Sequence, residues 1–170
     1  MSRILVTVLS AAKSSFSVAV EAREKTIWER SLYTSYFANV RKLPPDLVPV
    51  SIARSSPGWF AGRRELRLAP TWAMLKLRKP AYDVAFAELL THLDPADIYL
   101  TLGENAVLLC REKPGVSCHR RLVAEWIELH LGVEIPEFGF ARSACPTYEE
   151  MIWAGNRHAD DAPKTPPSDV

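Results

Sequence analysis

Residues 106–131 have the sequence AVLLCREKPGVSCHRRLVAEWIELHL, and this stretch predicts the class of the fold. The run from Ala106 to Cys110 is apolar throughout, which is typical of a strand that is buried on both faces of a sheet. After a short loop, His119–Leu131 carries apolar side chains at helical spacing and is followed by Gly132, a residue that commonly ends helices. A buried strand, a loop and an amphipathic helix in this order form the repeating unit of parallel α/β sheets.

Further strands and helices are predicted on both sides of this stretch. The runs Leu32–Phe37 and Val48–Ala53 favour strands, since they are rich in β-branched, aromatic and aliphatic residues. Apolar spacing and helix-opening prolines indicate helices from Pro70, from Tyr82 to Leu93 and from Pro95 to Gly103, and Val133–Ile135 resembles another strand. Because strands alternate with helices, we expect an α/β fold, namely a three-layer sandwich around a small, mostly parallel, Rossmann-like sheet.

The chain divides into three predicted parts. Residues 31–154 are expected to form one α/β core domain. Residues 1–30 are expected to be an N-terminal extension with strands over 4–9 and 16–20, where apolar residues run together or alternate. Residues 155–170 contain three prolines among mostly polar residues, which is typical of a disordered tail.

The composition is that of a soluble globular protein. The 170 residues suffice for one domain, and 48% of them are hydrophobic against 24% charged. No run reaches the ~18 apolar residues that a membrane span requires, so we expect no membrane association. The three cysteines are an odd number, which argues against a disulfide framework and favours a cytoplasmic location.

The net charge of +1 conceals a strong asymmetry between the two halves of the chain. Residues 1–80 contain 14 Lys and Arg against 5 Asp and Glu, whereas residues 81–170 contain 7 against 15. Such an asymmetry is typical of proteins with an anionic partner, and a nucleotide or a nucleic acid is the partner that we expect.

Cys118 and His119 lie at the start of the predicted helix, where unpaired N–H groups and the helix dipole favour a negative charge. A thiol in this place, beside His119 and Arg120, is expected to have a lowered pKa. One interpretation is therefore a nucleophilic Cys118, with His119 moving protons and Glu112 orienting the imidazole ring.

Two other interpretations of the same turn stay open. In the first, backbone N–H groups, Ser117, His119 and Arg120 bind a phosphate without covalent chemistry. In the second, the turn is only structural: Ser117 caps the helix, Cys118 fills a small buried space, and His119 and Arg120 are solvated.

A zinc site is a further alternative. Cys110, Cys118, His119 and Cys145 are residues of the types that bind zinc, but the chain has no pair of cysteines spaced as in a zinc knuckle. As part of a buried strand, Cys110 is expected to point into the core. We therefore predict no metal and no other cofactor.

A second group of candidate residues follows the predicted strand Val48–Ala53. This segment is rich in arginine and contains two aromatic residues, and its members are Arg54, Arg63, Arg64, Arg67, Trp59 and Phe60. Guanidinium groups bind phosphates and aromatic rings stack on bases. Since the carboxyl ends of parallel strands meet at one edge of a sheet, this segment is expected to face the Cys118 turn. Tyr33 and Ser35 are expected to line the same cleft.

Three stretches resemble the protein family called domain of unknown function 488. The most specific is Val107–Trp126, in which a strand ends in Cys-x-Glu-Lys and is followed by a Pro-containing loop, Cys-His-Arg and a helix. Tyr33–Ala38 and Val50–Pro57 are similar to the same family, and the resemblance covers residues 31–137. Many relatives have an Asp where this chain has Ile52. The resemblance implies a functional site at the Cys-His-Arg turn without implying a reaction.

These observations together predict an enzyme that acts on a nucleotide or a nucleic acid. The predicted catalytic residues are Cys118, His119 and Glu112. The predicted ligand-binding residues are Arg54, Ser117, Arg120, Lys113, Arg63 and Arg64, and Cys110, Tyr33 and Ser35 are predicted to line the pocket. The alternatives are a non-catalytic nucleic-acid-binding module and a regulatory protein with a reactive thiol.

Overall fold

The computed structural model describes residues 31–114, 116 and 118–141. The predictions for residues 1–30 and 155–170, for Ser117 and Cys145, and for the last part of the predicted core lie outside the described residues. Within the described ranges, no helix combines the length and the apolar character that are needed to cross a bilayer.

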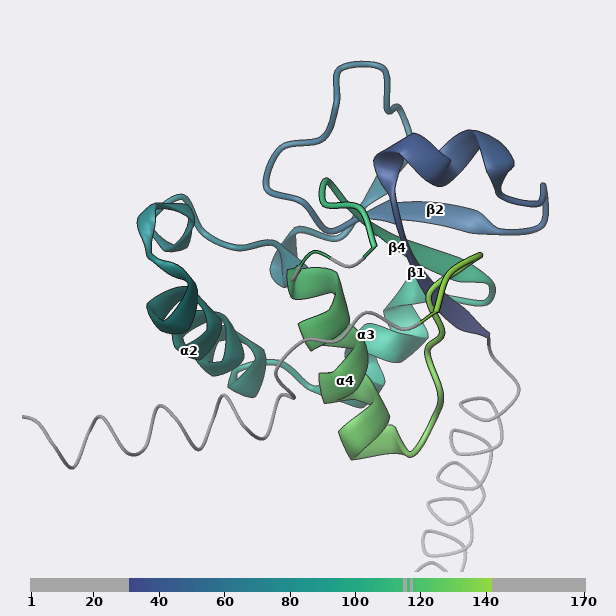
Figure 1. The fold of residues 1–170 in the computed structure, drawn as a ribbon. Helices are drawn as coiled ribbons and strands as arrows, with labels where there is room; N and C mark the ends of the chain where they lie inside the picture. Colours follow the sequence, from purple (N-terminus) through teal and green to yellow (C-terminus); the bar gives the residue numbers. More distant parts are fainter. Residues whose placement is uncertain (1–30, 115, 117, 142–170) are drawn as a thin grey trace, which may run out of the picture.

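The fold is built on a small sheet of four parallel strands (Figure 1). The strands are β1 (Leu32–Tyr36), β2 (Val48–Ser51), β3 (Arg63–Arg64) and β4 (Ala106–Cys110), and their order is β1-β4-β2-β3. All five residues of β4 are buried, which agrees with its apolar sequence and its place between β1 and β2. The predicted α/β fold with a small parallel sheet is thus confirmed.

Among the described residues, three α-helices accompany the sheet: α2 (Lys79–Thr91), α3 (Pro95–Leu102) and α4 (His119–Leu131). Proline begins α3, and the side chain of Asp94 caps it by accepting a hydrogen bond from the N–H of Ala96. Gly132 ends α4 with φ +65°, a left-handed conformation that glycine adopts without steric cost.

Short 3-10 helices replace some of the predicted elements. They are η1 (Phe37–Lys42), η2 (Leu66–Leu68) and η3 (Met74–Lys76). The predicted helix from Pro70 is therefore only the turn η3. The predicted strand over Val133–Ile135 does not form, and a single bridge between Thr34 and Glu137 occurs just after it.

The two faces of the sheet are covered differently. Alternation along β4 directs Leu108 to one face, where it packs with Phe86 of α2, Tyr99 of α3 and Trp126 of α4. On the opposite face, Val107 and Leu109 pack with Phe37 of η1 and with loop residues. The described residues therefore show α-helices on one face and a 3-10 helix with loops on the other, and the expected three-layer sandwich is not confirmed.

A buried ion pair joins the start of α4 to the segment after it. Arg120 has no exposed surface, and its guanidinium donates hydrogen bonds from Nε and Nη2 to Oε1 of Glu137. Nη1 of Arg120 donates a third hydrogen bond, of 2.6 Å, to the backbone carbonyl of Glu112. These bonds hold the loop after β4 against the segment that follows α4.

We expect Arg120→Leu to lower the free energy of unfolding by about 3–5 kcal/mol, because it leaves the carboxylate of Glu137 buried without its guanidinium partner. Chemical denaturation followed by circular dichroism measures this change. Arg41→Leu serves as the matched control, since Arg41 is exposed in η1 and its loss is expected to cost less than about 0.5 kcal/mol. Equal effects of the two substitutions would show that the buried pair does not stabilise the fold.

Candidate functional site

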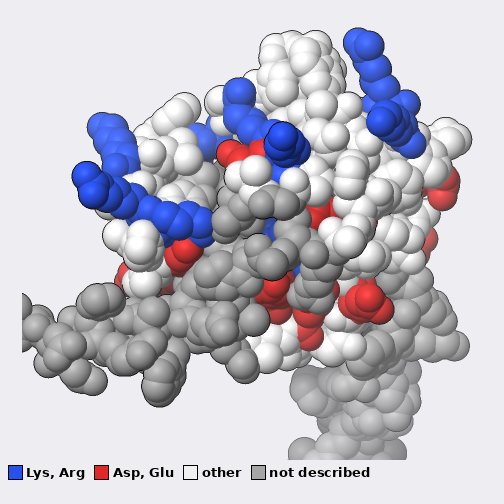
Figure 2. Space-filling view, in the orientation of Figure 1, with Lys and Arg blue, Asp and Glu red and all other residues white. Residues whose placement is uncertain are grey.

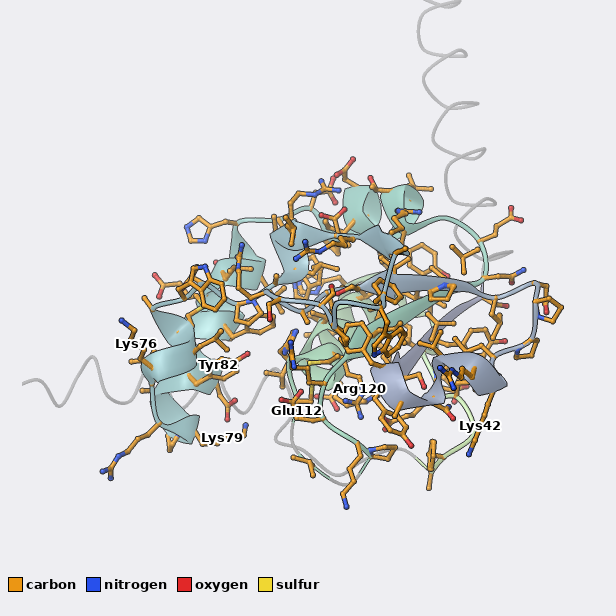
Figure 3. All side chains as sticks on the ribbon, turned by 90° about the horizontal axis from the view of Figure 1, so that it is seen from above. Lys42, Lys76, Lys79, Tyr82, Glu112 and Arg120 are labelled. Carbon is orange, nitrogen blue, oxygen red and sulfur yellow. The ribbon has the colours of Figure 1, made fainter. Side chains whose placement is uncertain are left out.

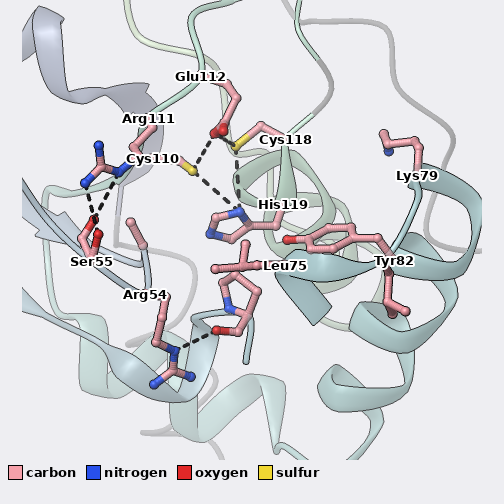
Figure 4. Close-up of a pocket in the computed structure, with 13 residues that line it drawn as sticks. Arg54, Ser55, Leu75, Lys79, Tyr82, Cys110, Arg111, Glu112, Cys118 and His119 are labelled. Carbon is pink, nitrogen blue, oxygen red and sulfur yellow. Dashed lines mark hydrogen bonds between the residues drawn. The ribbon is translucent and has the colours of Figure 1, made fainter. Parts of the chain in front are cut away.

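A pocket of about 270 Å³ opens at the carboxyl ends of β2 and β4 (Figure 4). Its walls come from the ends of both strands, from the segment that contains η3 and from the starts of α2 and α4. The residues that line it are Ala53, Arg54, Ser55, Pro70, Leu75, Leu77, Lys79, Tyr82, Cys110, Arg111, Glu112, Cys118 and His119. The expectation that residues following Val48–Ala53 face the Cys118 turn is met for Arg54.

Four reactive side chains meet in this pocket: Cys110, Glu112, Cys118 and His119. Oε2 of Glu112 accepts hydrogen bonds from the Sγ of Cys110 at 2.8 Å and from the Sγ of Cys118 at 3.1 Å. The Nδ1 of His119 lies 3.5 Å from the Sγ of Cys110 and 3.8 Å from the Sγ of Cys118.

The elements on both sides of the loop explain this convergence. Cys110 is the last residue of β4, and alternation puts its side chain on the same face as Leu108, toward the helices. Cys118 is the N-cap residue of α4, and His119 is the first residue of that helix. Cys110 is buried as predicted, but its sulfur faces the imidazole ring of His119.

A backbone carbonyl orients the ring of His119. Nε2 of His119 lies 3.0 Å from the carbonyl oxygen of Ile52, which follows β2. Because a carbonyl oxygen can only accept a hydrogen bond, Nε2 carries a proton and Nδ1 is the nitrogen that faces the two sulfurs. The ring also contacts Phe86 edge to face. The predicted role of Glu112 in orienting this ring thus belongs to the carbonyl of Ile52, while Glu112 forms hydrogen bonds with the two cysteines.

The cluster favours a thiolate on Cys118. Burial opposes ionisation, but the hydrogen bond from Cys110 and the positive charge of His119 lower the pKa of Cys118 to about 6. Burial would lower the pKa of His119, whereas the negative charge of Cys118 raises it above its ordinary value. The hydrogen bond to Cys118, together with burial, raises the pKa of Cys110, so this cysteine stays a thiol.

The carboxyl group of Glu112 is ionised in this environment. Burial would raise its pKa, but the hydrogen bonds that it accepts from Cys110 and Cys118 hold the pKa below its ordinary value. The carboxylate accepts from Cys118 only while that residue is a thiol, and its negative charge opposes the ionisation of Cys118.

Cationic side chains form part of the wall of the pocket. Arg54 is anchored by hydrogen bonds from Nε and Nη2 to the carbonyls of Pro70 and Ala69. Arg111 donates from Nε and Nη2 to the carbonyl oxygen and the hydroxyl oxygen of Ser55. These two guanidinium groups extend from the neighbouring ends of β2 and β4, so a negatively charged group is favoured at this side of the pocket.

Other predicted ligand-binding residues do not line the pocket. Arg120 is buried against Glu137 and therefore does not contact a ligand there. Arg63 donates to the carbonyls of Thr101 and Leu102 at the end of α3. These two side chains have structural partners in place of the predicted phosphate.

Lys113 and Arg64 are exposed outside the pocket, and Arg64 donates to the carbonyl of Arg54. Tyr33 and Ser35 belong to the opposite face of the sheet. There Tyr33 packs edge to face on Phe138 and Ser35 accepts a hydrogen bond from Asn39, so neither lines the pocket as predicted.

Several residues of the pocket were not predicted from the sequence, notably Arg111, Tyr82 and Lys79. Arg111 directly follows the predicted strand that ends in Cys110. This position alone could have predicted that Arg111 lies at the carboxyl end of the strand, where the pocket opens. Tyr82 has the apolar spacing of a core residue, and it does contact Phe86 by stacking. The side chain of Lys79 is held by Asp83 at i+4, so its charge is partly neutralised.

The cluster offers a metal ion three ligand atoms of two types. The sulfurs of Cys110 and Cys118 and a ring nitrogen of His119 all lie within 4.8 Å of one another. Three of the four zinc-type residues singled out in the sequence are therefore neighbours in the fold.

The rate at which iodoacetamide alkylates Cys118 is expected to rise with pH through about pH 6 and to level off above neutral pH. At pH 7, a pKa of about 6 leaves about 90% of this thiol ionised, against about 3% for an ordinary cysteine. Mass spectrometry of the labelled peptides, in buffer containing a chelator, measures the rate at each cysteine.

Cys110 is the internal control for this measurement, because its raised pKa keeps it protonated and slow to react at pH 7. An alkylation rate at Cys118 that rises only above pH 8 would contradict the prediction.

Comparisons of the chain with family models, with curated proteins and with solved structures find no match. The resemblance to domain of unknown function 488 therefore stays a prediction that rests on the Cys-x-Glu-Lys and Cys-His-Arg motifs. What the protein does has to be inferred from the chemistry of the pocket.

Proposed function

We propose that the protein is a cysteine-dependent enzyme that hydrolyses or transfers an electrophilic group, such as an acyl or phosphoryl group, of a small anionic substrate. The observation that supports it best is the pair formed by Cys118 and His119 in the pocket, with the sulfur 3.8 Å from Nδ1. A thiol and an imidazole in such proximity, with the ring oriented by a third group, form the usual arrangement for nucleophilic catalysis by cysteine.

The reaction proceeds in two steps. In the first, the thiolate of Cys118 forms a bond to the electrophilic atom while the bond to the leaving group breaks. The leaving group takes the proton from Nδ1 of His119. In the second, water attacks the covalent intermediate, Nδ1 takes a proton from the water, and the thiolate of Cys118 is released. Electrons and protons balance without an oxidant or a reductant.

The position of Cys118 on α4 assists the first step. As the N-cap residue of a 13-residue helix, it lies beside backbone N–H groups that have no partner within the helix. These groups and the helix dipole stabilise negative charge on the sulfur before attack. The hydrogen bond from Nε2 of His119 to Ile52 keeps Nδ1 directed at the sulfur throughout.

The size and the charge of the pocket define the class of substrate. Its volume of about 270 Å³ lies just below the range of roughly 300–1,000 Å³ that is usual for small-molecule sites. Arg54 and Arg111 favour a phosphate or a carboxylate, and Leu75 and Leu77 offer an apolar wall. A small metabolite with an anionic group meets these conditions better than a polynucleotide does.

The distribution of charge supports an enzyme more than a nucleic-acid-binding module. On the face shown in Figure 2, Lys and Arg stand in separate groups divided mostly by uncharged surface, and most of the Asp and Glu lie below them. Seen from above, Lys42 lies at the opposite end of the molecule from Lys76 and Lys79 (Figure 3). A module that follows a phosphate backbone needs a continuous basic stripe or groove.

The substrates to test are the 4-nitrophenyl esters of acetate, succinate and phosphate. For each ester that the wild type hydrolyses, Cys118→Ala is expected to slow the release of nitrophenolate by at least about 100-fold. His119→Gln removes the proton carrier and is expected to have an effect of the same order. Rates are measured spectrophotometrically, and mass spectrometry of the quenched wild type detects the adduct on Cys118.

Cys145→Ser is the control for the loss of a thiol, because Cys145 is the third cysteine of the chain and has no part in the proposed reaction. Equal rates for the wild type and Cys118→Ala, or an adduct at another residue, would exclude Cys118 as the nucleophile.

Arg111→Ala is expected to raise the KM for the succinate ester roughly tenfold and to leave the KM for the uncharged acetate ester unchanged, since only the former has a carboxylate for the guanidinium to bind. Arg41→Ala is the control for the general loss of a positive charge, because Arg41 is exposed in η1 away from the pocket. An equal rise of KM for both esters would contradict the proposed role of Arg111.

A further inference from the structure

We propose that Cys110, Cys118, His119 and Glu112 form a binding site for Zn²⁺, and that the bound ion blocks the nucleophile. The second half of this proposal rests on the proposed function, whereas the first half rests only on the geometry of the cluster. Two sulfurs and an imidazole nitrogen are the ligand set that zinc prefers, in contrast to magnesium and calcium, which prefer oxygen.

The distances between the ligand atoms fit a tetrahedral zinc ion. With Zn–S bonds of about 2.3 Å and Zn–N bonds of about 2.0–2.1 Å, a sulfur and a nitrogen on one ion are roughly 3.5 Å apart. Nδ1 of His119 lies 3.5 Å from the sulfur of Cys110 and 3.8 Å from that of Cys118. All three atoms lie within 4.8 Å of one another.

The surroundings of His119 also match those of a metal ligand. A histidine that binds a metal usually donates its second ring N–H to a carbonyl or a carboxylate, which fixes the tautomer and the ring plane. Nε2 of His119 makes this bond to Ile52 and leaves Nδ1 directed at the sulfurs.

Glu112 supplies the fourth ligand. Its Oε2 lies 2.8 Å and 3.1 Å from the two sulfurs but is not among the ligand atoms that lie within 4.8 Å of one another, so the carboxylate has to move toward the imidazole ring to complete a tetrahedron. Four protein ligands make a closed site, of the kind that holds zinc without offering it to a substrate. An ion in this place occupies the sulfur of Cys118 and prevents its attack.

The second cysteine is the feature that the proposed reaction leaves unused. The nucleophile and its base need only Cys118 and His119, yet the sulfur of Cys110 is nearer to Nδ1 than that of Cys118 is. Cys110 is 2% exposed at the end of the central strand, and His119 is 6% exposed at the start of α4. Both ligands therefore stand on rigid elements, which favours a site that is formed before the ion arrives.

The test is a titration of the full chain, stripped with a chelator, with Co²⁺ alone. We expect one Co²⁺ per chain, with thiolate-to-cobalt charge-transfer absorption and the strong visible bands of tetrahedral cobalt, both abolished by one equivalent of Zn²⁺. Cys110→Ser and His119→Gln are expected to weaken the affinity at least tenfold, and His92→Gln, at an exposed histidine outside the pocket, is expected to leave it unchanged. Absence of the charge-transfer band, or its persistence at full strength in Cys110→Ser, would overturn the metal site.

A second measurement separates this inference from the proposed function. One equivalent of Zn²⁺ is expected to slow the alkylation of Cys118 at least tenfold, and a chelator is expected to restore it. Rapid alkylation in the presence of bound zinc would refute the blocking. Rapid alkylation of the stripped protein without any cobalt band would refute the metal site while leaving the cysteine-dependent enzyme intact. Cobalt binding together with full ester hydrolysis by Cys118→Ala would refute the enzyme and leave the metal site intact.

Discussion

The guanidinium of Arg120 is the group on which the geometry of the pocket depends. It has no exposed surface, and it joins the carboxylate of Glu137 to the backbone carbonyl of Glu112. The loop between β4 and α4 is thereby held at its first residues, which fixes where the side chain of Glu112 begins. Since a buried charge is stable only where its partners are in place, the loop has little freedom to move the cluster apart.

Residues near one another in the sequence account for the part of the site that could be predicted. The apolar run of β4 and the spacing of α4 define a strand, a loop and a helix, and this unit places Cys118 and His119 at a helix start. The role of Arg120 could not be predicted in this way, because its partner Glu137 is 17 residues away and no local pattern connects the two. A basic residue in an anion-binding turn and a basic residue in a buried pair look the same in one sequence.

The arginines after β2 also have partners that are distant in the sequence, so their structural roles could not be predicted from local patterns. Arg67 pairs with Glu65 and with Asp97 at the start of α3, and Arg63 caps the carbonyls at the other end of that helix. Part of the positive charge of the first half of the chain is therefore neutralised by the second half within the fold. The two halves of the chain do differ in charge. The ion pairs of Arg67 show, however, that an excess of positive charge in the sequence does not by itself form a surface that binds a polyanion.

The interactions that stabilise a thiolate also favour the binding of a soft metal ion at the same sulfur. A neighbouring positive charge, helix N–H groups and the hydrogen bond from Cys110 favour one deprotonated sulfur against the opposing negative charge of Glu112, whether the next atom to arrive is a carbon, a phosphorus or a zinc. What separates the two outcomes is the second sulfur. A nucleophile gains from Cys110 only a hydrogen bond, which a serine can also donate, whereas a tetrahedral ion gains a ligand that serine does not replace. Cys110 is thus the residue at which the catalytic and the metal-binding uses of this pocket can be told apart.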